Sequence, residues 1–341
     1  MTNVSDGGGS TMPMAGGAAE ADPRFAEVGR TIECLLAEAA KLYVGQENLV
    51  RQALVALFAG GHVLIESVPG LGKTLLVRIL GEALGCSFGR IQFTADLMPS
   101  DITGQPVFDA RTQDFRFRPG PVFTHILLAD EINRSPAKTH AALLEIMQEG
   151  RVTVDGTTHR IEPPFLVLAT QNPVESEGTY HLPEAQLDRF LFKIVVDYPL
   201  AAEEDAILRL HCRPDPLERQ LSTTIRPLLD PERVIAIQEL CRHVRVDDAI
   251  VRYCSAIVRK TRQWPAFSLG ASPRAGIALV AGARVVAAFA GRSYVVPDDV
   301  TELVSAALRH RVILSPEAEV SGDTVDGALE ALMRTIEVPR L

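Results

Sequence analysis

Residues 67–74 have the types and spacing that phosphate binding requires. They read SVPGLGKT, the phosphate-loop pattern with Ser67 in place of its first glycine. Backbone N–H groups of such a loop surround phosphate oxygens at the start of a helix, where the helix dipole favours anions. Lys73 would reach the β- and γ-phosphates, and Thr74 would hold Mg²⁺. An ordinary strand–turn–helix is the alternative, but Gly70 and Gly72 allow the close backbone approach that a phosphate needs.

An acid pair and an asparagine could complete such a site. Asp130 and Glu131 directly follow the apolar segment His125–Ala129, and Asn172 comes shortly after a second one, Phe165–Ala169. Asp130 would help to hold Mg²⁺ through water, while Glu131 would polarise an attacking water. Asn172 could orient that water or touch the γ-phosphate, because ligands bind at the carboxyl ends of parallel strands. The alternatives are a solvated acid pair and a turn-forming asparagine before a proline.

Two arginines could supply positive charge to a phosphoryl-transfer reaction. Arg189 lies just before an apolar segment, and Arg274 follows Ser272 and Pro273 at the expected start of a helix. An arginine in either place could stabilise the negative charge that spreads over a transferring phosphoryl group. Each arginine could equally form a surface ion pair. With the phosphate loop, these residues predict an enzyme that binds and hydrolyses a nucleoside triphosphate, with ATP as the expected substrate.

Alternating strands and helices must position these groups. Continuous apolar runs predict five strands, at His62–Glu66, Ser87–Phe93, His125–Ala129, Phe165–Ala169 and Phe192–Val196. Helical patterns predict a broken helical stretch from Phe25 to Phe58 and helices at Lys73–Leu84, Lys138–Glu149 and Glu184–Arg189. Such strands between helices are typical of a parallel sheet that is covered on both faces. The expected fold class is therefore α/β, with a five-stranded parallel core.

Two insertions interrupt this alternation. Residues 104–123 contain short strand-like pieces and predict a hairpin. A stronger hairpin signal follows, because two short strand-like segments flank Asp155-Gly156-Thr157. We therefore expect two β-hairpins to be inserted into the α/β core.

The C-terminal part of the chain predicts a separate, all-helical domain. Helical periodicity appears at Ala202–Arg213, Pro231–Arg242, Asp247–Arg262, Pro273–Ala290 and Pro297–His310. Three of these segments begin with proline, which is favoured in the first turn of a helix. At the other end, the first 22 residues are rich in Gly, Ser and Ala, which is typical of disorder. The expected organisation is a disordered tail at 1–22, a nucleotide-binding core at 23–200 and a helical lid at 201–341.

Composition narrows the class of protein. The chain has 341 residues, 47% of them hydrophobic, and a net charge of −9, which argues against a general nucleic-acid binder. Its five cysteines form no CxxC pattern, so we expect neither a disulfide framework nor a zinc site. The expected location is a reducing cytoplasm. The most apolar stretch, Ile277–Ala290, is short and contains Arg284, which favours a buried helix over a membrane span.

The motifs, taken in order, closely resemble those of the MoxR-type AAA+ ATPases. They are VGQE (44–47), ESVPGLGKT (66–74), LLADEINRSPAKTHAALLEIMQEG (127–150), ATQNP (169–173), LPEAQLDRF (182–190) and GASPRA (270–275). The resemblance covers about residues 25 to 315. It implies a P-loop AAA+ core with two β-hairpin insertions and a helical lid, with ATP bound between core and lid.

The resemblance also implies a role for each candidate residue. Lys73 and Thr74 match Walker A, and Asp130 and Glu131 match Walker B. The remaining catalytic residues would be Asn172 as sensor 1, Arg189 as an arginine finger reaching a neighbouring subunit, and Arg274 as sensor 2. Mg²⁺ would be held by Thr74 and Asp130. The nucleotide would contact Val44, Gly45, Val68, Pro69, Gly70, Leu71, Gly72, Lys73, Thr74 and Leu75, with the first two near the adenine.

The same resemblance implies ATP and Mg²⁺ as cofactors and a homo-oligomeric ring, usually a hexamer, that acts as a chaperone-like remodeller. Its partner could be a protein with a von Willebrand factor A domain, and its task could be metal insertion. The alternative is a DNA-associated AAA+ motor of the helicase or Mg-chelatase branch, which DNA would stimulate with a steep salt dependence. A nucleotide switch without hydrolysis is a third possibility, against which Glu131, Asn172 and Arg189 count.

Overall fold

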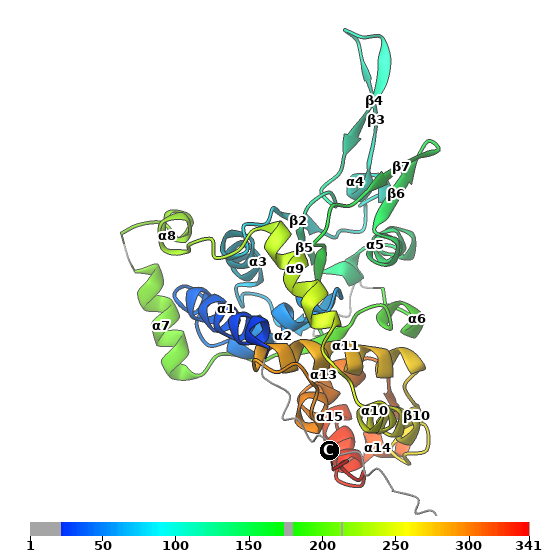
Figure 1. The fold of residues 1–341 in the computed structure, drawn as a ribbon. Helices are drawn as coiled ribbons and strands as arrows, with labels where there is room; N and C mark the ends of the chain where they lie inside the picture. Colours follow the sequence, from blue (N-terminus) through cyan, green and yellow to red (C-terminus); the bar gives the residue numbers. More distant parts are fainter. Residues whose placement is uncertain (1–21, 174–179, 213, 341) are drawn as a thin grey trace, which may run out of the picture.

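A five-stranded parallel sheet forms the centre of the molecule (Figure 1). The computed structural model describes residues 22–173, 180–212 and 214–340. The strands lie in the order β2-β5-β8-β1-β9, and every pair of neighbours is parallel. Their bounds are β1 Val63–Ser67, β2 Phe88–Gln92, β5 Ile126–Asp130, β8 Leu166–Gln171 and β9 Phe192–Val196. The predicted fold class and all five predicted strands are confirmed; β9 has the predicted bounds, and the ends of the other four shift by one or two residues.

Both faces of the three central strands, β5, β8 and β1, are buried, as the continuous apolar runs predict, whereas the edge strand β2 is largely exposed. Along β1, Val63 and Ile65 belong to one hydrophobic cluster and Leu64 to the other, because successive side chains of a strand point to opposite faces. The helices of this part are α1 Pro23–Ala40, α2 Glu47–Phe58, α3 Lys73–Ala83, α4 Pro99–Thr103, the 3₁₀ helix η1 Ile132–Arg134, α5 Ala137–Glu149 and α6 Glu184–Leu187. The sheet is thus a rigid base from which the carboxyl ends of the strands present the candidate residues.

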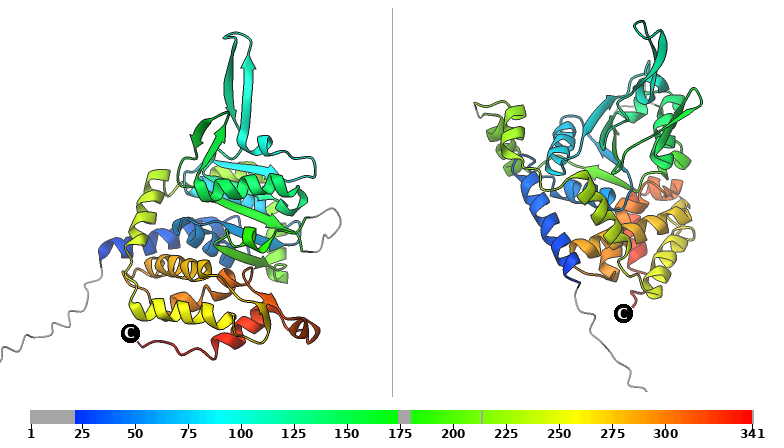
Figure 2. Two further views of the ribbon diagram at one scale, coloured as in Figure 1. Left: turned by 90° about the vertical axis from the view of Figure 1, so that its right-hand side faces the viewer. Right: turned by 45° about the horizontal axis from the view of Figure 1, so that its top comes forward.

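Both predicted hairpins are present. Strands β3 (Gly104–Asp109) and β4 (Asp114–Pro119) pair antiparallel, and so do β6 (Arg151–Val154) and β7 (Thr157–Arg160). The first hairpin projects far from the core, on the side of the molecule opposite the C-terminal helices (Figures 1 and 2).

The C-terminal region is mostly helical and packs against the N-terminal helices. Its helices are α7 Ala201–His211, α8 Leu217–Thr224, α9 Pro231–Arg242, α10 Asp248–Thr261, α11 Pro273–Phe289, α12 Pro297–Thr301, α13 Val304–Leu308, α14 Pro316–Val320 and α15 Val325–Met333. A Cβ atom at Gly29 of α1 would lie 3.0 Å from the carbonyl oxygen of Phe289, so this glycine permits the close approach of α1 and α11. One hydrophobic cluster therefore continues from α1 to α15.

Two expectations for this region are wrong. It is not all-helical, because β10 (Phe267–Leu269) and β11 (Ile313–Leu314) form an antiparallel pair, too short to leave a strand pattern in the sequence. The helix expected at Pro297–His310 is divided into α12 and α13. The hydroxyl of Thr301 donates to the carbonyl of Pro297 at 3.1 Å, a contact that competes with helical backbone bonds.

Three other expectations concern ends and spans. Only Asp22 of the predicted tail is described; it caps α1 by accepting from the N–H of Arg24. The helix expected at Ala202–Arg213 ends at His211, and Arg213 lies outside the described residues. Among the helices of the described residues, none has the length and apolar character that crossing a membrane requires. The domain boundary at residue 200 stays a prediction.

Candidate nucleotide-binding site

The phosphate loop connects β1 to α3 through two glycines in left-handed backbone conformation. Gly70 has φ 88° and Gly72 has φ 71°, values that side chains with a Cβ rarely adopt. Gly72 is also the N-cap of α3, where no side chain caps the helix. The first N–H groups of α3 are therefore free to donate to an anion, and the helix dipole favours a negative charge there.

Lys73, the first residue of α3, contacts the serine that replaces the loop's first glycine. Its Nζ donates to Oγ of Ser67 at 2.9 Å, and Ser67 is buried. Burial lowers the pKa of Lys73 from its usual value, while the charges of Asp130 and Glu131 oppose this change. The loop lysine and the acid pair are therefore close enough for their charges to interact.

The acid pair lies at the carboxyl end of β5 and is held by the two neighbouring strands. Asp130 accepts from Oγ1 of Thr170 on β8 at 2.7 Å and from Nη2 of Arg90 on β2 at 2.8 Å. Glu131 has φ 56°, an uncommon value for a residue other than glycine. Its N–H donates to Oγ1 of Thr170 at 2.9 Å, which fixes this turn of the chain.

The carboxylate of Glu131 is also held in place. Its Oε2 accepts from Nε2 of Gln92 at 2.7 Å and lies 3.2 Å from Nε of Arg134. Gln92 in turn accepts from Arg90 at 2.7 Å. Sequence reasoning missed Gln92, Arg90 and Thr170. Their roles depend on the position of β5 between β2 and β8, and the order of strands in a sheet cannot be read from periodicity.

Asn172 lies between the phosphate loop, which follows β1, and the acid pair at the end of β5. It directly follows β8, which pairs with β5 on one side and with β1 on the other. Its side chain is buried. This residue therefore lies at the same sheet edge as the phosphate loop and the acid pair, where a γ-phosphate and an attacking water would meet.

A pocket of about 500 Å³ adjoins the phosphate loop. It is bounded by the loop, by the connection between α1 and α2, and by α7 and α8. Tyr43 closes one side and donates from its hydroxyl to the carbonyl of Leu71 at 3.2 Å. The lining residues of the core are Leu42, Tyr43, Val44, Gln46, Pro69, Gly70, Leu71, Gly72 and Leu75. Val44 therefore lies where the resemblance implies an adenine contact, whereas Gly45 is not part of this lining.

The other wall of the pocket lies mostly on the lid side of the expected boundary at residue 200, but the sequence did not identify its residues. Its residues come from the chain just before α7, from α7 itself and from the first residue of α8. They are Tyr198, Pro199, Glu204, Ile207, Leu208, Leu210, His211 and Leu217. Its sequence signal was weak, because only the mixture of acidic and apolar residues in α7 distinguishes it. Since α10 to α15 contribute no lining residue, the pocket lies between the core and the first helices after residue 200, and not beneath the later helices.

The two arginines lie together, and neither lines this pocket. Arg189 follows α6, and Arg274 lies in the first turn of α11. Asp188 connects the two segments, because it accepts from Oγ of Ser272 at 2.9 Å and from Nε of Arg311 at 2.6 Å. The backbone N–H of Arg274 donates to Ser272 at 3.1 Å. The segments that carry the two arginines therefore lie on one side of the molecule.

The oxygen donors of Thr74 and Asp130 suit Mg²⁺ that is bound together with a nucleotide. Within the described residues, no three His, Cys, Asp or Glu side chains gather as a metal site. Mg²⁺ is commonly held by one or two carboxylates, with phosphate oxygens and waters completing an octahedron. The hydroxyl of Thr74 and the carboxylate of Asp130 are hard oxygen donors of this kind. The residues present therefore fit an ion whose remaining ligands come from the nucleotide and from water.

Comparisons with known proteins agree with this geometry. The sequence model of the ATPase family associated with various cellular activities (AAA) matches residues 62–192, and that of the AAA lid domain matches residues 259–332. The crystal structure of a protein from Cytophaga hutchinsonii superposes with a TM-score of 0.86 at 37% identity, covering 93% of this chain and 98% of that one. The shared fold therefore extends over both regions of the molecule.

Two curated relatives are similar over most of their length. Uncharacterized protein YeaC of Bacillus subtilis is 48% identical, covering 88% of this chain and 92% of its own. Chaperone MoxR1 of Mycobacterium tuberculosis is 42% identical, covering 91% of this chain and 83% of its own. With the phosphate loop, the acid pair and the lid in place, the chain belongs to the MoxR family of AAA ATPases.

Proposed function

We propose that this ATPase uses Mg²⁺ and ATP in a ring of identical subunits to remodel a protein partner, as a chaperone does. The observation that carries the catalytic part is the convergence of Lys73 with Asp130 and Glu131, whose charges act on the lysine. The chaperone part is supported by the similarity to Chaperone MoxR1. A partner with a von Willebrand factor A domain, a role in metal insertion and a cytoplasmic location follow from the family resemblance alone.

The chain's own residues divide the work of hydrolysis. The adenine and ribose would occupy the pocket beside Tyr43 and Val44, while the N–H groups of the phosphate loop surround the phosphates. Lys73 would leave Ser67 and neutralise charge on the β- and γ-phosphates. Thr74 and Asp130 would hold Mg²⁺, which neutralises phosphate charge when it is bound. These contacts position the γ-phosphate at the edge of the sheet.

Glu131 is the proposed general base. Its carboxylate would accept a proton from water as that water attacks the γ-phosphate, and Asn172 would orient the water. Each residue directly follows one of two strands that pair in the sheet, so both lie at the same sheet edge. A positive charge from Arg189 or Arg274 would stabilise the transition state. The family resemblance implies that Arg189 reaches a neighbouring subunit, and Asp188 and Ser272 join its segment to that of Arg274, so we propose that both arginines act on the neighbour's site.

The decisive experiment is Glu131→Gln. The amide cannot accept the proton, so ATP should bind with normal affinity while turnover falls by about 10²- to 10⁴-fold. The slow variant, kept in ATP, should also hold its client long enough for capture and identification, and Lys73→Ala is the matched control that captures nothing. Unchanged hydrolysis by Glu131→Gln would remove Glu131 from the proposed mechanism.

A further inference from the structure

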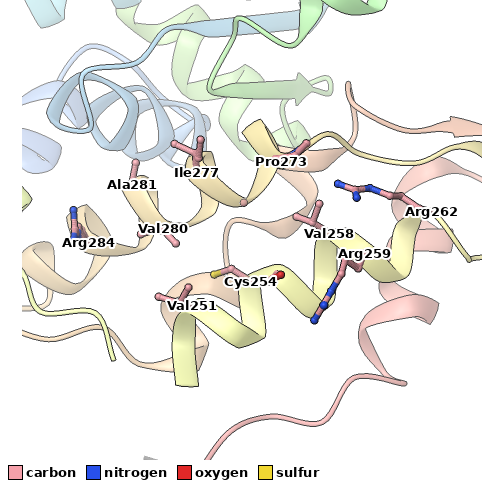
Figure 3. A pocket seen from close by; sticks show the side chains of 12 residues that line it. Val251, Cys254, Val258, Arg259, Arg262, Pro273, Ile277, Val280, Ala281 and Arg284 are labelled. Atoms are coloured by element: carbon pink, nitrogen blue, oxygen red, sulfur yellow. The ribbon is translucent and has the colours of Figure 1, made fainter. Parts of the chain in front are cut away.

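A second concave surface lies between α10 and α11, on the part of the molecule that carries Arg274. This groove encloses about 550 Å³ (Figure 3). Its lining is mainly apolar, with Val251 and Val258 from α10 and Ile277 and Val280 from α11. The Ile277 side chain is 69% exposed and Val251 is 47% exposed. Adjacent apolar side chains in a concave surface are typical of an interaction site.

Arginines lie at both ends of this groove. Figure 3 shows Arg284 at one end and Arg259 with Arg262 at the other. None of the three forms an ion pair with another described residue. The Nε atom of Arg284 is buried and has no hydrogen-bond partner in the described part of the chain. The groove therefore suits an occupant that has an apolar side chain and acidic groups nearby.

Helix α7 of the same sequence has this chemistry. Glu204 and Asp205 lie four and three residues before Leu208, so all three share one face of the helix. Asp205 also lies 3.7 Å from Nη2 of Arg209, and Glu204 and Leu208 border the nucleotide pocket as well. The Leu208 side chain is 63% exposed, and the only buried residue of α7 is Leu210. Within one chain α7 cannot fill the groove, because α7 and α10 lie on opposite sides of the molecule (Figures 1 and 2).

The positions of the two surfaces match the proposed ring. Helix α7 forms one wall of the nucleotide pocket, whereas the groove begins at Pro273, beside Arg274 on the same helix. The distance along α11 from Arg274 to Arg284 is about 15 Å at 1.5 Å per residue. A subunit that places Arg274 at its neighbour's phosphates therefore brings its groove close to the neighbour's pocket wall.

We propose that α7 of one copy docks in the α10–α11 groove of the next copy. Leu208 enters between Ile277 and Val280, and the acidic residues of α7 face the arginines at the ends of the groove. The contact is head-to-tail, so each copy uses two different surfaces and a ring can close. It joins each nucleotide pocket to the subunit that supplies its arginines. This inference rests on the proposed ring and specifies which surfaces form it.

The test uses the full chain with Glu131→Gln, in ATP, and measures assembly mass by sedimentation velocity. Ile277→Asp places a negative charge in the groove, and Leu208→Asp places one at the apolar position of α7 that would enter it. Either change alone should weaken subunit association on the order of 30-fold or more, as expected for a central apolar contact. Val338→Asp, at a residue that is 54% exposed and outside both surfaces, is the matched control and should leave the assembly unchanged.

Mixing the two variants distinguishes a head-to-tail contact from any other. The Ile277→Asp copy keeps a good α7, and the Leu208→Asp copy keeps a good groove, so the mixture should form dimers that cannot grow further. The pocket in that contact belongs to the Ile277→Asp copy, so a weakened pocket in the Leu208→Asp copy does not matter. Circular dichroism of each variant verifies that it is folded.

The failures are separable. If the Glu131→Gln parent stays a single chain in ATP, the proposed ring is wrong. If the parent assembles and both variants assemble equally well, the ring stands and the α7–groove contact is wrong. If the variants assemble but Ile277→Asp no longer captures the client, the groove binds the client instead, and the proposal is again overturned.

Discussion

At the scale of single residues, the catalytic groups already have partners within the protein. Lys73 donates to Ser67, Asp130 accepts from Thr170 and Arg90, and Glu131 accepts from Gln92. A nucleotide and its metal must replace several of these contacts. A hydrogen bond to a charged group contributes about 1.5–3 kcal/mol, so breaking these contacts adds to the free-energy cost of forming the catalytic arrangement.

The contact between Gln92 and Glu131 leads to the first prediction. Gln92→Ala removes the amide that holds the carboxylate, so Glu131 should reach the attacking water more often. Basal ATPase should rise by up to about tenfold, since Arg134 still contacts the carboxylate and 1.4 kcal/mol corresponds to a factor of ten. The affinity for ATP, measured by fluorescence titration, should stay the same. Gln105→Ala, on the exposed hairpin, is the matched control, and lower turnover in Gln92→Ala would mean that Gln92 assists the base.

His62 gives a prediction about pH. Its Nδ1 accepts from the N–H of Val167 and its Nε2 donates to the carbonyl of Met147, both at 3.0 Å, so the buried ring is neutral. Burial lowers the pKa of His62 to about 4, whereas the unfolded chain keeps about 6.5. The unfolded state therefore binds a proton first, and stability is lost as pH falls from about 6.5 towards 4, by at most about 3 kcal/mol.

Urea unfolding between pH 7.5 and 5 measures this loss. His62→Gln can donate and accept hydrogen bonds but does not titrate, so its stability should depend less on pH. Burial also lowers the pKa of His310, so the variant should remove only part of the slope. Parallel pH profiles for the two proteins would show that His62 does not contribute.

At the scale of elements, the two phenylalanines of β4 differ in how they pack. Phe117 stacks on His159 of the second hairpin with ring centroids 3.8 Å apart, which joins the bases of the two hairpins. Phe115 is 67% exposed, and its ring meets that of Phe108 edge-on with centroids 5.4 Å apart. Phe117 is therefore packed at the base of the hairpin, whereas Phe115 is exposed on the projecting strand.

This difference predicts separate effects in the β3–β4 hairpin. Phe115→Ser and Arg116→Ala should reduce client capture by Glu131→Gln protein, because both side chains lie exposed on the projecting strand. The same changes in an otherwise unaltered chain should leave basal ATPase intact. Phe117→Ala is the matched control, which should instead lower thermal stability. Equal loss of ATPase and capture would contradict a client-contacting role, and ATPase stimulation by DNA with a steep salt dependence would favour a DNA motor.

The sequence predicted local elements better than their arrangement. Each strand of the sheet left an apolar run of its own, and the first-turn prolines marked the starts of α9 and α11. The partners of the acid pair could not be predicted, since they come from strands that become neighbours only when the sheet forms. The β10–β11 pair was missed for a different reason, because two and three residues are too few to show a period.

At the scale of the whole molecule, the nucleotide pocket and the two arginines are separate features. The pocket lies between the phosphate loop and α7, whereas Arg189 and Arg274 are joined through Asp188 and Ser272. The pocket lining also lacks Lys73, Asp130 and Glu131, so it marks the place of the base and not that of the reacting phosphate. In the proposed ring, the two arginines of one subunit would stabilise the phosphoryl transfer in the next.

Complementation between two inactive variants tests whether Arg189 acts in the neighbouring subunit. An Arg189→Ala subunit should bind ATP normally but fail to complete its neighbour's site, and a Lys73→Ala subunit has the opposite defect. Each variant alone should lose activity, by on the order of 10³- to 10⁵-fold where an arginine finger is removed. In a random equimolar mixture, about a quarter of the contacts pair a good pocket with a good arginine. ATPase after subunit exchange should therefore rise far above that of either variant.

An arginine acting within its own chain allows no such rescue, because every subunit of the mixture would still have one defect. Absence of rescue, with exchange confirmed by labelled subunits, would assign Arg189 to its own subunit and remove the main structural argument for an obligatory ring.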